Sequence, residues 1–296
     1  ITEIGYAAFS GCTGFTGSLD VSAYTKITKI EGFAFNGCSG FTGELKLPPN
    51  ITEIGYAAFS GCTGFTGSLD VSAYTKITKI EGFAFNGCSG FTGELKLPPN
   101  ITEIGYAAFS GCTGFTGSLD LSACTKLTKI ESDAFRDCKG FMGSLDLSAY
   151  TKLTKIGNNV FENCSGFSGE LKLPLNITEI GEGAFRSCSG FTGSLDLSAC
   201  TKLMKIKSNA FWDCSGFTGE LKLPANITEI GEYAFFGCTK SEIKLPQSIT
   251  KIGNCAFGYS GFFCKKVKVP NVAPHYDRIK TLVTQSSYPE DRIESY

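Results

Sequence analysis

Apolar and polar residues alternate in short segments that recur through the whole chain. One such segment is Leu19-Asp20-Val21, and its counterpart in the next copy is Leu45-Lys46-Leu47. Alternation with a period of two predicts a short strand with apolar side chains inward and charged side chains outward. A second apolar segment, I-T-E-I in its first occurrence at residues 1–4, leads into a glycine turn.

The pattern has a fixed period. Residues 1–50 and 51–100 are identical, and related copies continue to about residue 270. Aligned on I/L-T-x-I, the chain contains eleven coils of 22 to 26 residues, which begin at Ile1, Ile27, Ile51, Ile77, Ile101, Leu127, Leu153, Ile177, Leu203, Ile227 and Ile249. The longer form ends S-L-D-[VL]-S-A-[YC]-T-K, and the shorter form ends E-L-K-L-P-x-N.

No coil of this size can bury its apolar residues alone, so the period predicts a repeat solenoid in which equivalent residues stack. Phenylalanines then form continuous columns, one through Phe9 and Phe35 and another through Phe15 and Phe41. We expect the Ala8-Phe9-x-x-Cys12 stretch to form one helical or 3₁₀ turn that points Phe and Cys inward together.

The two ends of the stack differ. We expect residues 1–269 to form the solenoid and residues 270–296 a C-terminal cap and tail. Apolar residues at Tyr276, Ile279, Leu282 and Val283 fit one face of a short helix that starts near Pro274, and residues 284–296 read as a loose tail. At the other end no cap is evident. Exposed apolar residues there, Ile1, Ile4 and Phe9, predict either an end-to-end homodimer or further coils upstream.

The chain has fourteen cysteines, but most occupy one position per coil. This spacing indicates a ladder of small, buried, reduced thiols rather than a disulfide framework. The ladder consists of Cys12, Cys38, Cys62, Cys88, Cys112, Cys138, Cys164, Cys188, Cys214 and Cys238. In the last coil Ser260 stands at the ladder position, and Cys255 with Cys264 is the one plausible disulfide.

Composition argues against several function classes. Twenty-seven basic and 28 acidic side chains give a net charge of −1, whereas nucleic-acid binders usually carry a basic face. There is no transmembrane run, and because the chain starts within the repeat pattern we expect it to be a piece of a longer protein. His275 is the only histidine, so no catalytic dyad, metal site or cofactor site is expected in the repeats, and no enzymatic activity.

One coil reads Ile230-Gly231-Glu232-Tyr233-Ala234-Phe235-Phe236-Gly237-Cys238 and continues Ile243-Lys244-Leu245-Pro246. This motif, repeated over about residues 1–270, resembles the BspA-like (Treponema pallidum type) leucine-rich repeats. The resemblance implies a right-handed leucine-rich repeat stack with a parallel β-sheet on its concave face. It also implies a surface-exposed or secreted protein of a microbe that adheres to host matrix proteins or other cells. No catalytic residues belong to the repeat.

Outward strand positions carry alternating charges. One per coil, these residues are Asp20, Lys46, Asp70, Lys96, Asp120, Asp146, Lys172, Asp196, Lys222, Lys244 and Lys268. The alternation breaks at Asp120 and Asp146, and from Lys222 onward the row is basic, with Lys266 beside it. The row has two interpretations: cross-strand charge pairing that sets the register, or a surface that binds a protein partner.

Two further features leave alternatives open. Tyr24, Tyr74 and Tyr150 share a corner position with Cys124 and Cys200, which suits a packed corner or an interface anchor. Sequons at Asn50, Asn100, Asn163, Asn176 and Asn226 indicate turn residues or, in a eukaryotic host, glycosylation sites. The favoured function is a protein-binding adhesion module. A structural spacer is one alternative, and a carbohydrate-binding module, which exposed Trp or Tyr stripes would favour, is the other.

Overall fold

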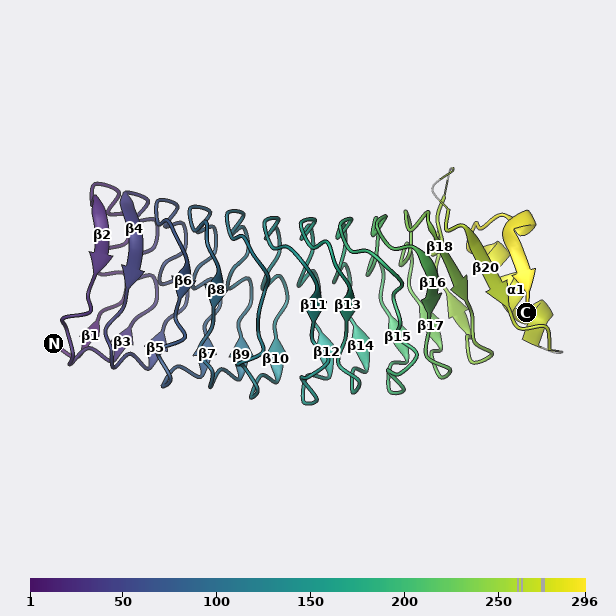
Figure 1. The fold of residues 1–296 in the computed structure, drawn as a ribbon, viewed down its shortest axis with the longest axis horizontal. Coiled ribbons are helices and arrows are strands. Elements are labelled where there is room, and N and C mark those ends of the chain that lie inside the picture. The colour runs from purple at the N-terminus through teal and green to yellow at the C-terminus, as the bar shows by residue number, and fades with distance from the viewer. Residues whose placement is uncertain (260, 262, 273–274) are drawn as a thin grey trace. The chain divides into compact units, whose positions relative to one another are not determined.

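A computed structural model of the chain describes residues 1–259, 261, 263–272 and 275–296. The chain forms two compact units, Ile1–Met142 and Gly143–Tyr296. Each unit is a stack of coils that carries two rows of short strands, and every strand pairing within the rows is parallel (Figure 1). The parallel-stranded solenoid is therefore confirmed.

The first row, the Thr-x-Ile row, lies on the I/L-T-x-I segments. In residues 1–142 it consists of β1 (Glu3–Ile4), β3 (Lys29–Ile30), β5 (Glu53–Ile54), β7 (Lys79–Ile80), β9 (Glu103–Ile104) and β10 (Lys129–Ile130). In residues 143–296 it consists of β12 (Lys155–Ile156), β14 (Glu179–Ile180), β15 (Lys205–Ile206), β17 (Glu229–Ile230) and β19 (Lys251–Ile252).

The second row, the Leu row, lies on the L-D and L-K segments, where strands were predicted. In residues 1–142 it consists of β2 (Gly17–Asp20), β4 (Phe41–Lys46), β6 (Leu69–Asp70) and β8 (Leu95–Lys96). In residues 143–296 it consists of β11 (Leu145–Asp146), β13 (Leu171–Lys172), β16 (Gly219–Lys222), β18 (Ser241–Lys244), β20 (Lys266–Val269) and β21 (Ile293–Ser295). Equivalent residues face each other, as in the pair Asp20 and Lys46.

The corner between the rows is not the helical turn that the sequence suggests. Cys12 N–H donates to Phe9 O within the corner (3.1 Å), but Ala7, Phe9 and Gly11 N–H donate to carbonyls of the following coil at 2.7–2.9 Å. Ala7 and Gly11 have φ of 51° and 73°, in the left-handed region. Alternating right- and left-handed residues send every second amide to the neighbouring coil, which a continuous helix would keep for itself. As predicted, the Phe and Cys side chains point inward together and are buried in the coils that follow.

The core of each unit consists of stacked aromatic columns. Phe59 and Phe85 rings lie 5.4 Å apart and nearly parallel, and Phe65 and Phe91 rings lie 5.6 Å apart. Close stacking leaves no room for a side chain at several glycines, among them the glycine two residues after a ladder cysteine. A Cβ on Gly90 would lie 2.2 Å from Thr63 O, and one on Gly190 would lie 2.1 Å from Phe167 O.

The C-terminal end is capped. Helix α1 (His275–Gln285) buries Ile279 and Val283, as predicted, while Pro274 lies outside the described residues. The prediction of a loose tail is wrong. After the 3₁₀ turn η1 (Glu290–Arg292), β21 pairs in parallel with β20 and closes the edge of the Leu row.

Candidate functional site

The charged residues of the Leu row are exposed and pair across strands within each unit. Lys46 Nζ lies 3.7 Å from the Asp20 carboxylate, and Lys96 Nζ lies 3.8 Å from the Asp70 carboxylate. The same pairs recur as Lys172 with Asp146 at 3.8 Å and Lys222 with Asp196 at 3.2 Å. Cross-strand pairing, one of the two interpretations of this row, is therefore present.

The aspartates of the row also have a local role that the sequence reasoning missed. Asp20 Oδ1 accepts hydrogen bonds from Ser22 Oγ (2.6 Å) and Ser22 N–H (3.0 Å). These bonds are the main reason that the pKa of Asp20 is lowered, with Lys46 a smaller cause. The D-x-S sequence repeats the arrangement at Asp70, Asp146 and Asp196, and Asp120 accepts from Ser122 N–H. The D-x-S spacing is the signal that could have revealed these turns.

The basic end of the row has partners that the alternation did not predict. Lys222, Lys244 and Lys268 stand in register on β16, β18 and β20. Lys268 Nζ lies 2.8 Å from Glu242, and Lys244 Nζ lies 3.9 Å from the centre of the Tyr296 ring. Lys266 pairs with Glu294 on β21. Glu242 and the C-terminal strand therefore neutralise part of this patch.

The cysteine ladder is made of free, buried thiols, except that Cys12 in the first coil is half-buried. Cys62 Sγ donates to Phe35 O at 3.1 Å, and the same bond to the Phe carbonyl of the preceding coil recurs along each unit. Burial raises the pKa of Cys62 and Cys112 to about 12. These thiols are packing groups and not nucleophiles at neutral pH.

The disulfide that the sequence left open between Cys255 and Cys264 is not formed, since both thiols are free and buried. Cys264 Sγ instead donates to Phe235 O (3.4 Å), which is the ladder contact of the last coil. Cys255 lies at the left-handed corner position, and its N–H donates to Ser286 O (2.8 Å) in the cap. Ser260, the residue expected at the ladder position, lies outside the described residues.

Two of the corner tyrosines and four of the five sequon asparagines contact neighbouring residues of the stack. Tyr74 O–H donates to Leu47 O, and Tyr150 is buried, whereas Tyr24 in the first coil is exposed. The Asn50 side-chain amide donates to Thr25 O in the preceding coil (2.9 Å). The same bond to the preceding coil is made by Asn100, Asn176 and Asn226. The packed-corner interpretation therefore holds at Tyr74 and Tyr150, and the turn interpretation at the four asparagines that make this bond.

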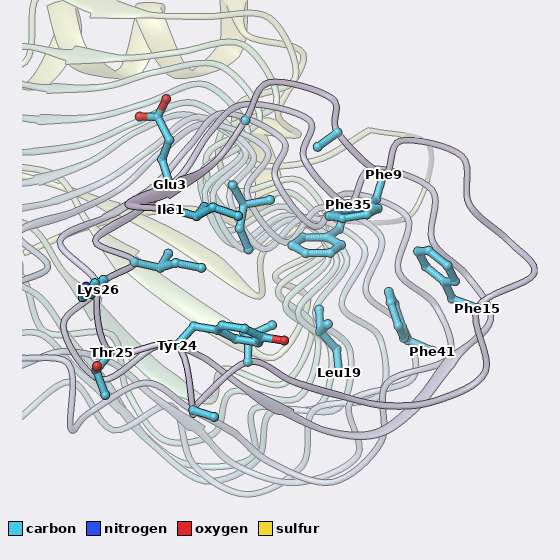
Figure 2. A pocket seen from close by; sticks show the side chains of 16 residues that line it. Ile1, Glu3, Phe9, Phe15, Leu19, Tyr24, Thr25, Lys26, Phe35 and Phe41 are labelled. Atoms are coloured by element: carbon cyan, nitrogen blue, oxygen red, sulfur yellow. The ribbon is translucent and has the colours of Figure 1, made fainter.

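The first coil surrounds an apolar hollow of about 850 Å³ at the open end of residues 1–142. Figure 2 shows Ile1, Phe9, Phe15, Leu19 and Tyr24 directed into the loop of backbone, with Phe9 stacked on Phe35. Ile1 is 97% exposed, as expected for this end, while Ile4 is half-buried. End-to-end pairing of two copies through this face stays a prediction.

A feature that the sequence reasoning missed is a row of surface aromatics in residues 1–142, here called the aromatic stripe. Successive ring centres are 5.6, 5.4, 5.4 and 5.1 Å apart along Tyr6, Phe33, Tyr56, Phe83 and Tyr106. Tyr56 and Tyr106 are 47% and 46% exposed although neighbouring coils flank both. The tyrosines follow the Ile-Gly of the longer coils and the phenylalanines the Glu-Gly of the shorter coils.

In the part of the chain that the structure describes, no group of three or more His, Cys, Asp or Glu residues could hold a metal ion. No helix among those residues is long and apolar enough to cross a membrane.

Comparison with known proteins gives a family and a fold. The family described as "BspA type Leucine rich repeat region" matches residues 2–142, 66–192 and 128–263, in six copies. A crystal structure of a leucine-rich repeat protein from Bacteroides ovatus matches with a TM-score of 0.53 and 23% identity, over 100% of this chain and 87% of that one.

A structure described as a leucine rich cell surface protein from Faecalibacterium prausnitzii has a TM-score of 0.47 and 22% identity, over 94% of this chain and 79% of that one. No curated protein matches the chain in sequence. Because the family match extends from residue 2 to residue 263, the chain belongs to the BspA type leucine-rich repeat family.

Proposed function

We propose that this chain is a recognition module of a cell-surface or secreted protein and that it binds a protein partner, a host matrix or partner-cell protein, through the Leu row. The contact residues would be Asp20, Lys46, Asp70, Lys96, Asp120, Asp146, Lys172, Asp196, Lys222, Lys244, Lys266 and Lys268. The surface location rests on the family resemblance.

One observation carries the proposal: the row presents a charged, solvent-accessible side chain in coil after coil. Its cross-strand ion pairs, at 3.2–3.8 Å, join side chains that are about half exposed. Exposed pairs of this kind contribute about 0–1 kcal/mol each. A partner can therefore exchange them for intermolecular pairs at little cost, and solenoids bind through such extended surfaces.

The basic end is the most distinctive part of this surface. Lys222, Lys244 and Lys268 are neighbours in register, and the nearest acidic groups are shared with Lys265 or belong to the preceding coil. Three adjacent cations favour an acidic partner and speed its association at low ionic strength.

The test is binding of the chain to a panel of matrix proteins and host glycans at low and high salt. We expect salt-sensitive binding to one protein, since exposed charges are screened over about 8 Å at physiological ionic strength. Changing Lys222, Lys244 and Lys268 to Glu should weaken that binding at least tenfold, about 1.4 kcal/mol.

The matched control makes the same charge change at Lys126, Lys152 and Lys202, which are exposed at coil ends. Equal losses in both triple variants, or no loss in either, would contradict a contact through the Leu row. Absence of binding across the panel would favour the structural spacer, and binding to glycans alone would favour the carbohydrate module.

A further inference from the structure

The aromatic stripe is not needed to hold the coils together. At the same corner positions, the three coils of residues 153–226 carry Asn158 and Asn159, Glu182 and Gly183, and Ser208 and Asn209. The corner has the same left-handed backbone with either kind of residue, with φ of 57° at Phe33 and 52° at Asn159. The repeat therefore folds the same corner with small polar residues, and the rings of the stripe call for another explanation.

Two rings of the stripe belong to residues whose backbone conformation is unfavourable for a bulky side chain. Phe33 and Phe83 adopt φ of 57° and 56°, a region that disfavours bulky side chains and suits Asn or Gly. Both rings nevertheless stay partly exposed. A strained backbone that presents large rings to solvent points to a role in binding.

The tyrosines are held in a defined orientation. A Cβ added to Gly32 would lie 3.6 Å from Tyr6 Cδ2 and Cε2, and one on Gly82 would lie 3.3 Å from Tyr56 Cε2. Tyr6 and Tyr56 therefore each rest one ring edge on a glycine of the next coil, beside the Phe that follows this glycine. Rigid rings of this kind lose little conformational entropy when a ligand stacks on them.

The strand row that leads into the stripe carries an excess of negative charge. Over the same coils, the charged residues two to four positions before the rings are Glu3, Glu31, Glu53, Glu81 and Glu103, against Lys29 and Lys79. Each lysine is shared: Lys29 Nζ lies 2.8 Å from Glu31 and 3.4 Å from Glu53, and Lys79 is shared by Glu81 and Glu103 in the same way. A ligand with cationic side chains complements this flank and can also form cation–π contacts with the tyrosines.

The spacing of the rings selects the backbone of the ligand. The tyrosines recur every second coil, about 9.6 Å apart at a strand spacing of about 4.8 Å. A polyproline II helix rises about 9.3 Å in one turn of three residues. An extended proline-rich segment laid along the stripe would therefore place one proline per turn on each of Tyr6, Tyr56 and Tyr106.

We propose that the aromatic stripe binds a basic, proline-rich polypeptide segment in the polyproline II conformation. Aromatic-lined surfaces recognise such segments because the ligand is already extended before it binds. This inference shares with the proposed function the idea of a protein partner, but it uses a different surface, so each can fail without the other.

The test is calorimetric titration of the whole chain with a Pro-Pro-Arg repeat peptide of about 12 residues, or four polyproline II turns. We expect saturable binding that is at least tenfold weaker for a Gly-Ser-Arg peptide of the same charge and for a Pro-Pro-Glu peptide. Equal affinity for the Gly-Ser-Arg peptide, or no binding of the Pro-Pro-Arg peptide, would overturn the proposal.

The decisive variant combines Phe33→Asn, Tyr56→Ser and Phe83→Asn, which installs residues of the kind used at these corners elsewhere in the chain. It should fold, because Asn suits the left-handed φ, and it should lose at least tenfold in peptide affinity. The control Tyr233→Asn changes an aromatic residue at the same left-handed position, φ 55°, outside the stripe, and should keep full affinity.

Two other outcomes separate the ligand classes and the surfaces. Binding of an uncharged oligosaccharide of linked glucose units in place of the peptide, lost in the triple variant, would make the stripe a glycan site and overturn the proposal. The Lys222, Lys244 and Lys268 reversal should leave peptide binding unchanged. A loss of peptide affinity in that reversal variant would show that the peptide binds through the Leu row and would contradict binding through the aromatic stripe.

Discussion

The two compact units have the same coil backbone but carry different side chains at its corner. In residues 1–126 the corner carries the aromatic stripe, and the column three to four residues later holds Asn and Ser, such as Asn36, whose side-chain amide donates to Ser60 O. In residues 143–296 the relation is reversed. The left-handed corner is mostly polar, and the later column holds Glu162, Arg186, Trp212 and Phe236.

The column of Glu162, Arg186, Trp212 and Phe236 is linked by an ion pair, a cation–π contact and a contact between two rings. The Arg186 guanidinium lies 3.7 Å from the centre of the Trp212 ring and 3.7 Å from the Glu162 carboxylate. The Trp212 ring lies 6.0 Å from that of Phe236. The inward residues therefore determine the backbone conformation of a coil, whereas the outward columns can change without altering that backbone.

The largest expected effect tests the shared interior and appears at alkaline pH. Burial raises the pKa of Cys62 and Cys112 in one unit and of Cys238 in the other to about 12, against 9.0 for an exposed thiol. Stability is then intact below about pH 9 and falls as the pH rises from 9 toward 12, because only the unfolded chain ionises. In this range each thiol lowers the free energy of unfolding by about 1.4 kcal/mol per pH unit.

Thermal unfolding followed from pH 7 to 11, with hydrogen exchange resolved by peptide, measures this loss in both units. Replacing Cys62 and Cys112 by Ala should make the decline with pH shallower in residues 1–142 alone. If stability falls with pH as steeply in the variant as in the native chain, or falls in only one unit of the native chain, the two units do not share this interior.

The next effect concerns close approach between coils. Gly90→Ala and Gly190→Ala should each destabilise their unit by about 1–3 kcal/mol, because the new Cβ meets carbonyl oxygens of the preceding coil. The control is Gly14→Ala, at the same repeat position but with no atom within 4 Å of the added Cβ. Urea unfolding gives the three free energies, and a Gly14 variant as unstable as the other two would contradict the steric explanation.

The smallest effect tests the column that differs. Arg186→Ala removes the cation–π contact with Trp212 and the ion pair with Glu162, and should cost about 0.5–2 kcal/mol. Ser60→Ala, in the equivalent column of residues 1–142, keeps its backbone carbonyl contact and should change stability by less than about 0.5 kcal/mol. Trp212 fluorescence during urea unfolding reports the first value, and equal effects of the two substitutions would remove the contrast.

Much of the fold and of the charged site could be predicted from the sequence. The period places equivalent residues in register, so the pairing of Asp20 with Lys46 and the burial of the cysteine ladder follow from counting residues. The C-terminal helix follows from its apolar spacing. The corner turn could not be predicted, because a short Ala-Phe-x-x-Cys stretch fits a helical turn as well as alternating left- and right-handed residues.

The sequence by itself determined the period, the strands of the Leu row, the inward columns and the family, because these repeat and each coil confirms the next. The tertiary structure alone decided contacts between residues that the period does not align. Tyr56 and Phe83 occupy different repeat positions and meet only when coils stack, Cys264 takes the ladder place in an irregular coil, and Glu294 reaches Lys266 from the C-terminal strand. Such contacts depend on the three-dimensional path of the chain between distant residues, and no local pattern encodes that path.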